Sequence, residues 1–393
     1  MPDVVILSTA RTPIGKAYKG ALNDTSGAML AAHAIGHALA RSGIEAAEIE
    51  DVFLGCGLPE GTTGLNVARR AAILAGIPVT AAGATIDRQC ASGLQAIATL
   101  GNAIRHGGVV AGVAGGVESI SLVQTERMHT HRLVDERLAE LKPAVYMDMV
   151  DTAEIVARRY GVSRESQDAY SVNSQLRYAA AAAAGRIDRE IVPILTSRRV
   201  PDPVTGKSRP ESVNLAVDEG SRPGTTLNGL AALRPVRPEG TVTAGNASQL
   251  SDGASAQVLM SSAVAERRGM NPLGCLRGFT VVGCEPDEMG VGPVYAVPRL
   301  LREHGLRVTD IGLWEINEAF AAQVIHCIER LGLDPERVNV NGGAIAIGHP
   351  YGMTGSRLVG HALIEAQRRH EKYAVVSMCV GGGMGAAGLL EVY

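Results

Sequence analysis

The stretch ATIDRQCASGL, residues 84–94, predicts how the chain folds. Its first residues, 84–87, have the composition of a short buried strand, and apolar residues such as Leu94 and Ile97 then recur at helical spacing. A strand followed at once by a helix is typical of α/β proteins. Cys90 would lie at the turn between them, where free N–H groups and the helix dipole favour a thiolate over a thiol. A small cysteine that packs inertly in the core is the alternative.

The rest of the chain continues this pattern. Short runs rich in valine and isoleucine alternate with longer alanine- and leucine-rich stretches, as in a largely buried sheet covered by helices. The strands that we expect span residues 4–10, 51–56, 84–87, 109–116, 258–261, 313–316 and 374–380. In the middle of the chain we expect helices at residues 151–160 and 164–184, with Ser163 as N-cap and Gly185 as stop signal.

A weak internal repeat occurs at a constant offset of 262 residues. Gly43-Ile44 corresponds to Gly305-Leu306, and Ala91-Ser92-Gly93 corresponds to Met353-Thr354-Gly355. Two similar α/β halves are the simplest interpretation, although matches this short also arise by chance in alanine- and glycine-rich sequence.

The sequence between these halves has a different composition. It holds most of the arginine-rich and proline-rich segments, which indicates an inserted loop domain. We therefore predict an N-terminal half, an inserted loop domain and a C-terminal half, spanning residues 1–118 with 245–270, residues 119–244 and residues 271–393.

The composition argues against several classes of protein. The 393 residues are 46% hydrophobic and 20% charged, which is ordinary for a globular enzyme with a buried core. A net charge of −3 and 3% aromatic residues provide neither a basic surface nor stacking platforms, so we expect no nucleic-acid partner. We find no membrane-spanning run and no targeting signal, so we expect a cytoplasmic protein. The six cysteines include no CxxC pair, which favours free thiols over disulfides or a metal site.

A histidine near the C-terminus is a candidate partner for Cys90. His349 lies between Gly348, which permits close approach, and Pro350, which biases the backbone toward extended conformation. Its imidazole could pair with Cys90 and polarise a thioester oxygen, or it could be only a hydrogen-bonded turn histidine. The other nine histidines lack such a setting. We expect four of them on helix surfaces or edges, namely His33, His37, His361 and His370.

Cys379 ends an apolar run and opens a glycine-rich turn, CVGGGMG at residues 379–385. We expect its thiol at a sheet edge, with the N–H of Gly381 exposed nearby. Residues 383–388 also fit the pattern GxGxxG. A dinucleotide site needs a following helix and a further βαβ unit, and only five residues remain, so we reject that interpretation.

Asn317 is a further candidate. It follows the strand expected at residues 313–316 and precedes a helical run through Val324 and Leu331. It could cap that helix. It could also hold a water that faces a thioester oxygen, and the two roles do not exclude each other.

Taken together, these segments resemble the thiolase family over essentially the whole chain. The matching motifs are RQCASGLQ at 88–95, TAGNAS at 243–248, NEAF at 317–320, GGAIAIGHP at 342–350 and CVGGGMG at 379–385. Five ordered motifs at family spacing make a specific match. The resemblance implies a five-layered αβαβα fold of two pseudo-symmetric halves with an inserted loop domain, in agreement with the repeat and the change of composition.

The resemblance also implies the ligands of the protein. Coenzyme A thioesters of fatty acid metabolism would be the substrates, free CoA would be the acyl acceptor, and no cofactor would be bound permanently. The pantetheine arm would reach Cys90 past Ser248 and the inserted domain. The other residues implied to bind substrate are Met149, Met289, Phe320 and Tyr351. Family members are usually homodimers or homotetramers.

The mechanism implied by the resemblance uses both thiols. Cys90, activated by His349, would attack the keto carbonyl of a 3-ketoacyl-CoA and retain the acyl group. Cys379 would protonate the departing acetyl-CoA enolate and later deprotonate the CoA that removes the acyl group. His349 and a water on Asn317 would stabilise one oxyanion, and the N–H groups of Cys90 and Gly381 the other. The reverse reaction would be a Claisen condensation.

Some residues depart from the commonest family pattern. Tyr351 and Met353 stand where smaller residues are often found, and Asp148 stands where short-chain members tend to carry histidine. We expect an acetyl-CoA C-acyltransferase, with an acetoacetyl-CoA-specific biosynthetic thiolase as the alternative. A decarboxylating ketoacyl synthase typically has histidine or asparagine in place of Cys379. A noncatalytic acyl-CoA carrier usually loses a catalytic residue, so both of these are less favoured.

Overall fold

The structure, a computed structural model, describes residues 4–202 and 207–393. Residues 1–3 and 203–206, which fall in the predicted N-terminal half and the predicted insert, lie outside the described residues. The strands of the main sheet are β1 Val4–Arg11, β2 Gly15–Lys16, β3 Asp51–Gly55, β4 Ala84–Ile86, β5 Ala111–Ser119, β8 Ser251–Ser261, β9 Gly274–Gly283, β10 Leu313–Ile316, β11 Tyr373–Val380 and β12 Met384–Val392. They form a ten-stranded sheet in the order β10-β11-β12-β9-β1-β8-β5-β3-β4, with β2 paired to β8.

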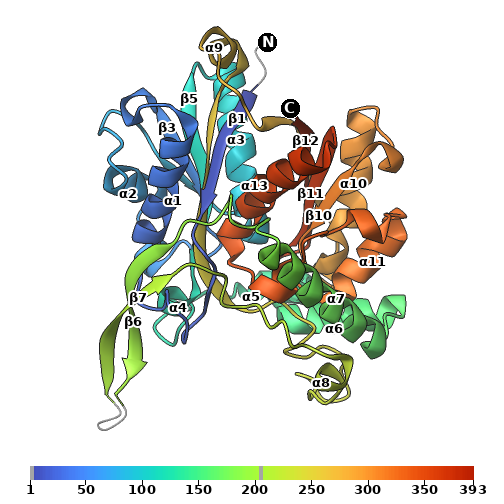
Figure 1. Ribbon diagram of the computed structural model, residues 1–393. Helices are drawn as coiled ribbons and strands as arrows, with labels where there is room; N and C mark the ends of the chain where they lie inside the picture. Colours follow the sequence, from blue (N-terminus) through green and yellow to red (C-terminus); the bar gives the residue numbers. More distant parts are fainter. Residues whose placement is uncertain (1–3, 203–206) are drawn as a thin grey trace.

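The sheet has two halves that meet where β1 pairs with β9, at Val5–Cys275 and Ile6–Gly274. Helices α1 Gly27–Ser42 and α2 Val67–Leu74 pack on the outer face of the first half. Helices α10 Gly292–Glu303 and α11 Ala321–Leu331 flank the outer face of the second. Between the halves lie α3 Ser92–His106 and α13 Tyr351–Arg369, as Figure 1 shows. The layers therefore follow the predicted order αβαβα.

The two halves repeat one another with the predicted offset. The short helices η1 Ala46–Glu48 and η6 Val308–Asp310 start 262 residues apart, and so do β3 and β10, and β5 and β11. Gly43 follows α1 with a φ of 72°, and Gly305 follows α10 with a φ of 65°. Glycine is favoured in this left-handed conformation, so the repeated glycine has the same backbone role in both halves. The prediction of pseudo-symmetric halves is confirmed.

The segment between β5 and β8 lies beside one end of the sheet and carries most of the smaller elements. They are α4 Ile120–Val123, α5 Glu136–Leu141, α6 Met149–Tyr160, α7 Arg164–Ala183, α8 Leu227–Ala231 and a hairpin of β6 Ile194–Pro201 and β7 Ser208–Leu215. The hairpin projects from the molecule (Figure 1). As predicted, the Ser163 side chain caps α7 by accepting from Ser166 N–H, and Gly185 follows the helix in a left-handed conformation. Among the described helices, none is long and apolar enough to cross a membrane.

Several strands differ from the sequence-based prediction. β8 begins at Ser251, seven residues before the expected residue 258. The prediction misses the first part of this strand because its polar side chains suggest exposure to solvent, whereas the structure buries them with hydrogen-bond partners. For example, Asp252 accepts the Ser121 N–H at 2.9 Å, and Gln257 donates to Thr9 Oγ1 at 3.0 Å. β2, β6, β7, β9 and β12 are absent from the prediction. The remaining helices are α9 Ser262–Arg267 and α12 Ala344–Ile347.

Candidate active site

Cys90 lies in the 3-10 turn η3 Gln89–Ala91, between β4 and α3. Its sulfur accepts hydrogen bonds from the backbone N–H groups of Gly381 and of Cys90 itself. Gln89 has a left-handed φ of 47°, and its Cγ would lie 3.7 Å from a Cβ added to Gly381. The structure thus brings the turn before α3 against the glycine-rich turn after β11.

The thiol of Cys90 is protonated at neutral pH. Burial raises the pKa of Cys90 to about 12, the N–H of Gly381 opposes this shift, and the carboxylate of Glu118 adds to it. The expectation that this turn favours a thiolate is therefore wrong for the resting protein, because the loss of water outweighs the two N–H groups. A base must remove the proton when the sulfur reacts.

Cys379 lies near the carboxyl end of β11 and is fully buried. β11 pairs with both β10 and β12, so the expected place at a sheet edge is wrong, and the thiol lies instead near the end of an inner strand. Burial raises the pKa of Cys379 well above its ordinary value, and a thiolate at Cys90 would raise it further, which places the two sulfurs near each other. The glycine-rich turn leads directly into β12, in agreement with the rejection of a nucleotide site.

His349 lies just before α13 and is 3% exposed. Its Nδ1 is 2.6 Å from Thr354 Oγ1, and the Thr354 hydroxyl donates its hydrogen to Pro350 O at 2.8 Å. The hydroxyl can therefore only accept from His349, so Nδ1 carries the hydrogen and Nε2 keeps a free electron pair. Burial lowers the pKa of His349 to about 3, and the positive charge of Arg357 contributes, so the imidazole is neutral.

Asn317 follows β10 and faces this imidazole. Its Nδ2 lies 3.3 Å from His349 Nε2, while its Oδ1 is buried without a hydrogen-bond partner among the described residues. The capping role is wrong, because α11 has Phe320 as its N-cap and no side-chain capping bond. Buried acceptors without a protein partner typically bind an ordered water. Asn317 is thus placed to hold a water beside His349.

A small apolar cluster contains Cys379 and three of the residues predicted to bind substrate, namely Met149, Met289 and Phe320. They belong to α6, to η5 Pro286–Val291 and to the residue preceding α11. Ser248 lies at the border of this cluster, where its N–H donates to Ala319 O at 3.0 Å. These four positions from distant segments therefore converge near the second thiol.

Tyr351 lies apart from that cluster, at the start of α13. Its ring is edge-on to the His349 ring, with 5.3 Å between centroids, and its hydroxyl lies 3.5 Å from Gln124 Oε1. Burial raises the pKa of Tyr351, and a thiolate at Cys90 would raise it further. Tyr351 is therefore close to both the imidazole and the first thiol.

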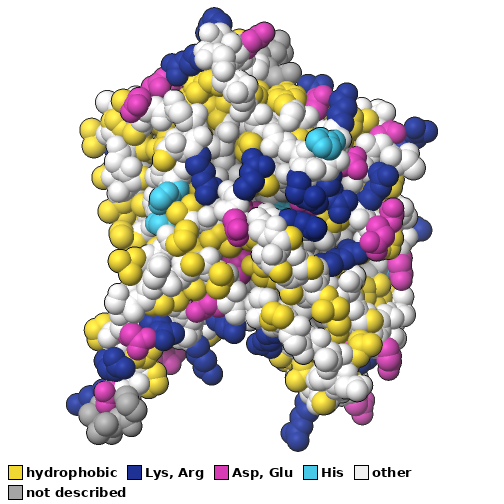
Figure 2. Space-filling model, in the orientation of Figure 1, with side chains coloured by type: hydrophobic (Ala, Val, Ile, Leu, Met, Phe, Trp, Pro, Cys, Tyr) yellow, Lys and Arg dark blue, Asp and Glu magenta, His cyan; other side chains and the backbone are white. Residues whose placement is uncertain are grey.

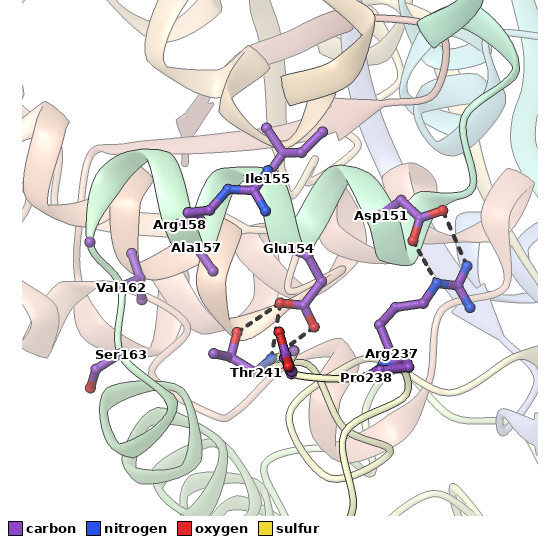
Figure 3. Close-up of a pocket in the computed structure, with 13 residues that line it drawn as sticks. Asp151, Glu154, Ile155, Ala157, Arg158, Val162, Ser163, Arg237, Pro238 and Thr241 are labelled. Atoms are coloured by element: carbon purple, nitrogen blue, oxygen red, sulfur yellow. Dashed lines mark hydrogen bonds and ion pairs between the residues drawn. The ribbon is translucent and has the colours of Figure 1, made fainter.

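A surface groove of about 820 Å³ lies along α6. Figure 3 shows that three of its charged groups have partners: Arg237 contacts Asp151, and Glu154 accepts from the N–H and hydroxyl of Thr241. None of its lining residues is one of the site residues above. The groove therefore supplies no group to the reaction centre.

Two residues beside the reaction centre carry only a weak signal in the sequence. Thr354 orients His349, and its signal is a hydroxyl five residues after the histidine. Glu118 lies near the end of β5 with no exposed surface, and its signal is a carboxylate directly after a continuous apolar strand. Neither signal is specific without the fold.

His361 is the histidine whose predicted position is wrong. It is 3% exposed, and its Nδ1 lies 3.1 Å from Glu190 Oε2. The reason is that α13 lies between the two halves of the sheet and has little solvent-facing surface. In the part of the chain that the structure describes, no group of three or more His, Cys, Asp or Glu side chains could hold a metal ion.

Comparisons with known sequences match both halves of the chain. The N-terminal domain of thiolase matches residues 4–263, and the C-terminal domain of thiolase matches residues 270–392. The 3-ketoacyl-CoA thiolase of Bacillus subtilis is 47% identical over 394 residues, with 100% of both chains covered. The peroxisomal 3-ketoacyl-CoA thiolase B of Mus musculus is 44% identical, with 99% of this chain and 91% of that protein covered.

Comparisons with solved structures agree. The acetyl-CoA acetyltransferase of Bacillus anthracis has a TM-score of 0.89 at 38% identity, covering 100% of this chain and 99% of its own. The human mitochondrial 3-ketoacyl-CoA thiolase in complex with CoA has a TM-score of 0.87 at 36% identity, covering 100% of this chain and 98% of its own. Sequence and fold together show that the chain belongs to the thiolase family of acyltransferases.

Proposed function

We propose that this thiolase cleaves 3-ketoacyl-CoA with free CoA and performs the reverse Claisen condensation of acyl-CoA with acetyl-CoA. The observation that carries the proposal is the convergence of two free thiols with a neutral, oriented imidazole. The names of its relatives support the substrate class, and one solved relative is a complex with CoA.

Cys90 is the proposed nucleophile, and His349 is its base. Because Nε2 of His349 carries no hydrogen, it can take the proton of the Cys90 thiol as the sulfur bonds to the 3-keto carbon. The bond between C2 and C3 of the substrate then breaks. The acyl group remains on Cys90 as a thioester, and the electron pair leaves with acetyl-CoA as an enolate.

Cys379 is proposed to act first as an acid toward C2 of the enolate and then as a base toward the thiol of CoA. As a neutral thiol it can donate its proton to C2 of the enolate, which releases acetyl-CoA. The resulting thiolate takes the proton of an incoming CoA thiol. The CoA sulfur attacks the thioester on Cys90, the shortened acyl-CoA leaves, and His349 returns the first proton to Cys90.

Two sets of donors are proposed to stabilise the oxyanions in these steps. The N–H groups of Cys90 and Gly381, which point at the Cys90 sulfur, suit the oxygen of an acyl group attached there. Nε2 of His349 becomes a donor once it has accepted a proton. Together with a water on Asn317, it suits the oxygen of the second thioester.

The apolar cluster around Cys379 is proposed to hold the thioester end of the substrate. Met149, Met289 and Phe320 would exclude water there, and Ser248 would face the pantetheine arm. Tyr351 lies beside His349, where it would narrow the space for the acyl group, so an acetoacetyl-CoA-specific enzyme is the second candidate. Met353 is fully buried in a different apolar cluster, so its departure from the family pattern concerns packing.

Intact-protein mass spectrometry after exposure to acetyl-CoA tests the proposed roles. The wild type should gain one acetyl group, Cys90→Ser should gain none, and Cys379→Ala should be acetylated but should lose thiolysis of acetoacetyl-CoA. Each role is tested separately in this way. An adduct that persists in Cys90→Ser would contradict the assignment.

The acyl preference needs a kinetic series. Measuring kcat/KM for 3-ketoacyl-CoA substrates of increasing chain length should show a decline for longer chains, and Tyr351→Leu should reduce that decline. Equal values across the series in the wild type would argue against Tyr351 as a wall of the acyl site.

We propose a homodimer or homotetramer, because β4 ends the sheet order and apolar side chains around α2 are exposed, with Leu65 91% and Val79 74% accessible. Figure 2 shows apolar side chains gathered where α1 and α2 lie. The molar mass from light scattering tests this, and Leu65→Asp should lower it.

The free cysteines support a reducing compartment such as the cytoplasm, and the insert is proposed to span residues 119–244.

A further inference from the structure

Glu118 is a buried carboxylate that the mechanism above does not use. Its Oε2 accepts from the N–H groups of Gly57 and Gly352, each at 2.8 Å, and its Oε1 accepts from the N–H of Leu58 at 3.2 Å. The Cys56 thiol lies 3.5 Å from Oε1. All four partners are donors, so the site suits a negatively charged carboxylate, which only accepts hydrogen bonds.

These donors belong to both halves of the chain. Gly57 and its neighbours follow β3 in the first half, whereas Gly352 lies in the first turn of α13, three residues after His349. There is no spare space at this joint. A Cβ added to Gly57 would lie 3.0 Å from Tyr351 Cβ and 3.5 Å from Gln89 O, and a Cβ added to Gly352 would lie 2.6 Å from Cys56 Cα. Glu118 therefore ties the surroundings of Cys90 to the start of the helix that follows His349.

The carboxylate of Glu118 also acts on the nucleophile. Two carboxylates raise the pKa of Cys90, namely Glu118 of β5 and Asp87 before η3. A thiolate at Cys90 would in turn raise the pKa of Tyr351 of α13 and of Cys379 of β11. A negative charge near a thiol favours the protonated form. Burial raises the pKa of Glu118 to about 7, while the N–H groups of Gly352 and Gly57 favour its charged form.

We propose that Glu118 is a positioning residue for acyl transfer, which holds Cys90 and His349 at their working separation and whose charge adds to the burial that disfavours the Cys90 thiolate. The proposal rests on the proposed role of Cys90 as nucleophile. A carboxylate with only a structural role would hold the same joint but would leave the protonation of Cys90 unchanged. The two cases are therefore separable by a pH profile.

Glu118→Gln tests the electrostatic part. It keeps the shape of the side chain, retains one oxygen that can accept from Gly57 and Gly352, and removes the charge. Alkylation of Cys90 by iodoacetamide, followed by peptide mass between about pH 7 and pH 10, should become about tenfold faster, because removing one nearby charge lowers the thiol pKa by about one unit. An alkylation profile identical to that of the wild type would overturn this part of the proposal.

Glu118→Asp tests the tether, which is the set of hydrogen bonds that join Glu118 to Gly57 and Gly352. If the glutamine variant does not fold, this variant alone tests the proposal. It keeps the charge but withdraws the carboxylate by one methylene, so the alkylation profile should stay unchanged while kcat for acetoacetyl-CoA thiolysis falls about tenfold or more. Turnover within about twofold of the wild type would show that the tether is not needed. Glu303→Gln, on an exposed carboxylate of α10 paired with Arg299, is the matched control and should change neither readout. The acetyl adduct on wild-type Cys90, measured in parallel, reports separately whether the proposed function holds.

Discussion

The reactive groups of this thiolase are neutral at rest, and that follows from where their side chains lie. Many reactive cysteines are thiolates stabilised by a cationic partner. Here burial disfavours the charged form of both members of such a pair: it raises the pKa of Cys90 to about 12 and lowers that of His349 to about 3. The proton must therefore move during the attack. Thr354 decides which nitrogen receives it, because its hydroxyl accepts the Nδ1 hydrogen and leaves Nε2 without a hydrogen of its own.

The lowered pKa of His349 predicts the pH dependence of acylation. A base whose pKa is about 3 stays unprotonated throughout the range in which an ordinary histidine, with a pKa of about 6.5, would gain a proton. The rate of Cys90 acetylation by acetyl-CoA, followed by quenched-flow mass spectrometry, should thus not fall between pH 7.5 and roughly pH 5. A fall centred near about pH 6.5 would mean that the imidazole is in water. Cys90→Ser, which should show no adduct, gives the baseline.

At this scale the sequence predicts the candidate groups but not their protonation. Cys90, His349 and Cys379 are recognisable because each adjoins glycine or a turn, and the structure places all three in one region. The pKa of each group depends on residues distant in sequence, such as Glu118 and Arg357, and on how much water the fold excludes. Those contributions are set only by tertiary packing.

Among the elements, the predictable strands are those whose residues are mostly apolar. β10 has the predicted bounds, and β11 differs from its prediction by one residue, because runs such as LWEI and YAVVSMCV lie between clear breakers. β12, with the sequence MGAAGLLEV, is hidden by its glycines and alanines, which suit close packing rather than strand propensity. β8 is hidden by polar residues whose partners lie far away in the sequence. The sequence pattern therefore misses strands that are stabilised by contacts with residues distant in the sequence.

The contact between β5 and the start of α13 gives a prediction about stability. A Cβ added to Gly116 would lie 1.9 Å from the backbone oxygen of Gly352, so Gly116→Ala must push the helix away from the strand. We expect it to lower the free energy of unfolding by about 1–3 kcal/mol or more, measured by urea denaturation. Gly36→Ala in α1 is the control, because nothing lies within 4 Å of the added Cβ. There alanine should stabilise the helix by about 0.5–1 kcal/mol. Equal effects of the two substitutions would contradict the close packing.

For the molecule as a whole, one buried ion network joins all three sections of the chain. Arg11 of β1 contacts Glu190 Oε1 at 2.9 Å and Asp218 Oδ1 at 2.7 Å, both within the insert. Glu190 in turn contacts His361 of α13. Tyr178 of α7 also donates to Asp218. The first strand, the insert and the second half are thus linked through charges that water does not reach, so we expect them to unfold together.

Arg11→Met tests this link. It leaves Glu190 and Asp218 buried without their cation, which should cost about 3–5 kcal/mol of unfolding free energy in chemical denaturation at neutral pH. Burial alone would raise the pKa of Glu190, but Arg11 and His361 lower it from 4.5 to about 2. A lowered carboxyl pKa adds stability that is present above about pH 4.5 and is lost as the pH falls toward 2. The wild type should therefore lose stability more steeply than Arg11→Met over that range. Arg307→Met, at an exposed ion pair with Asp310, should leave both the stability and its pH dependence nearly unchanged. If Arg11→Met behaved like this control, the network would not be what holds the three sections together.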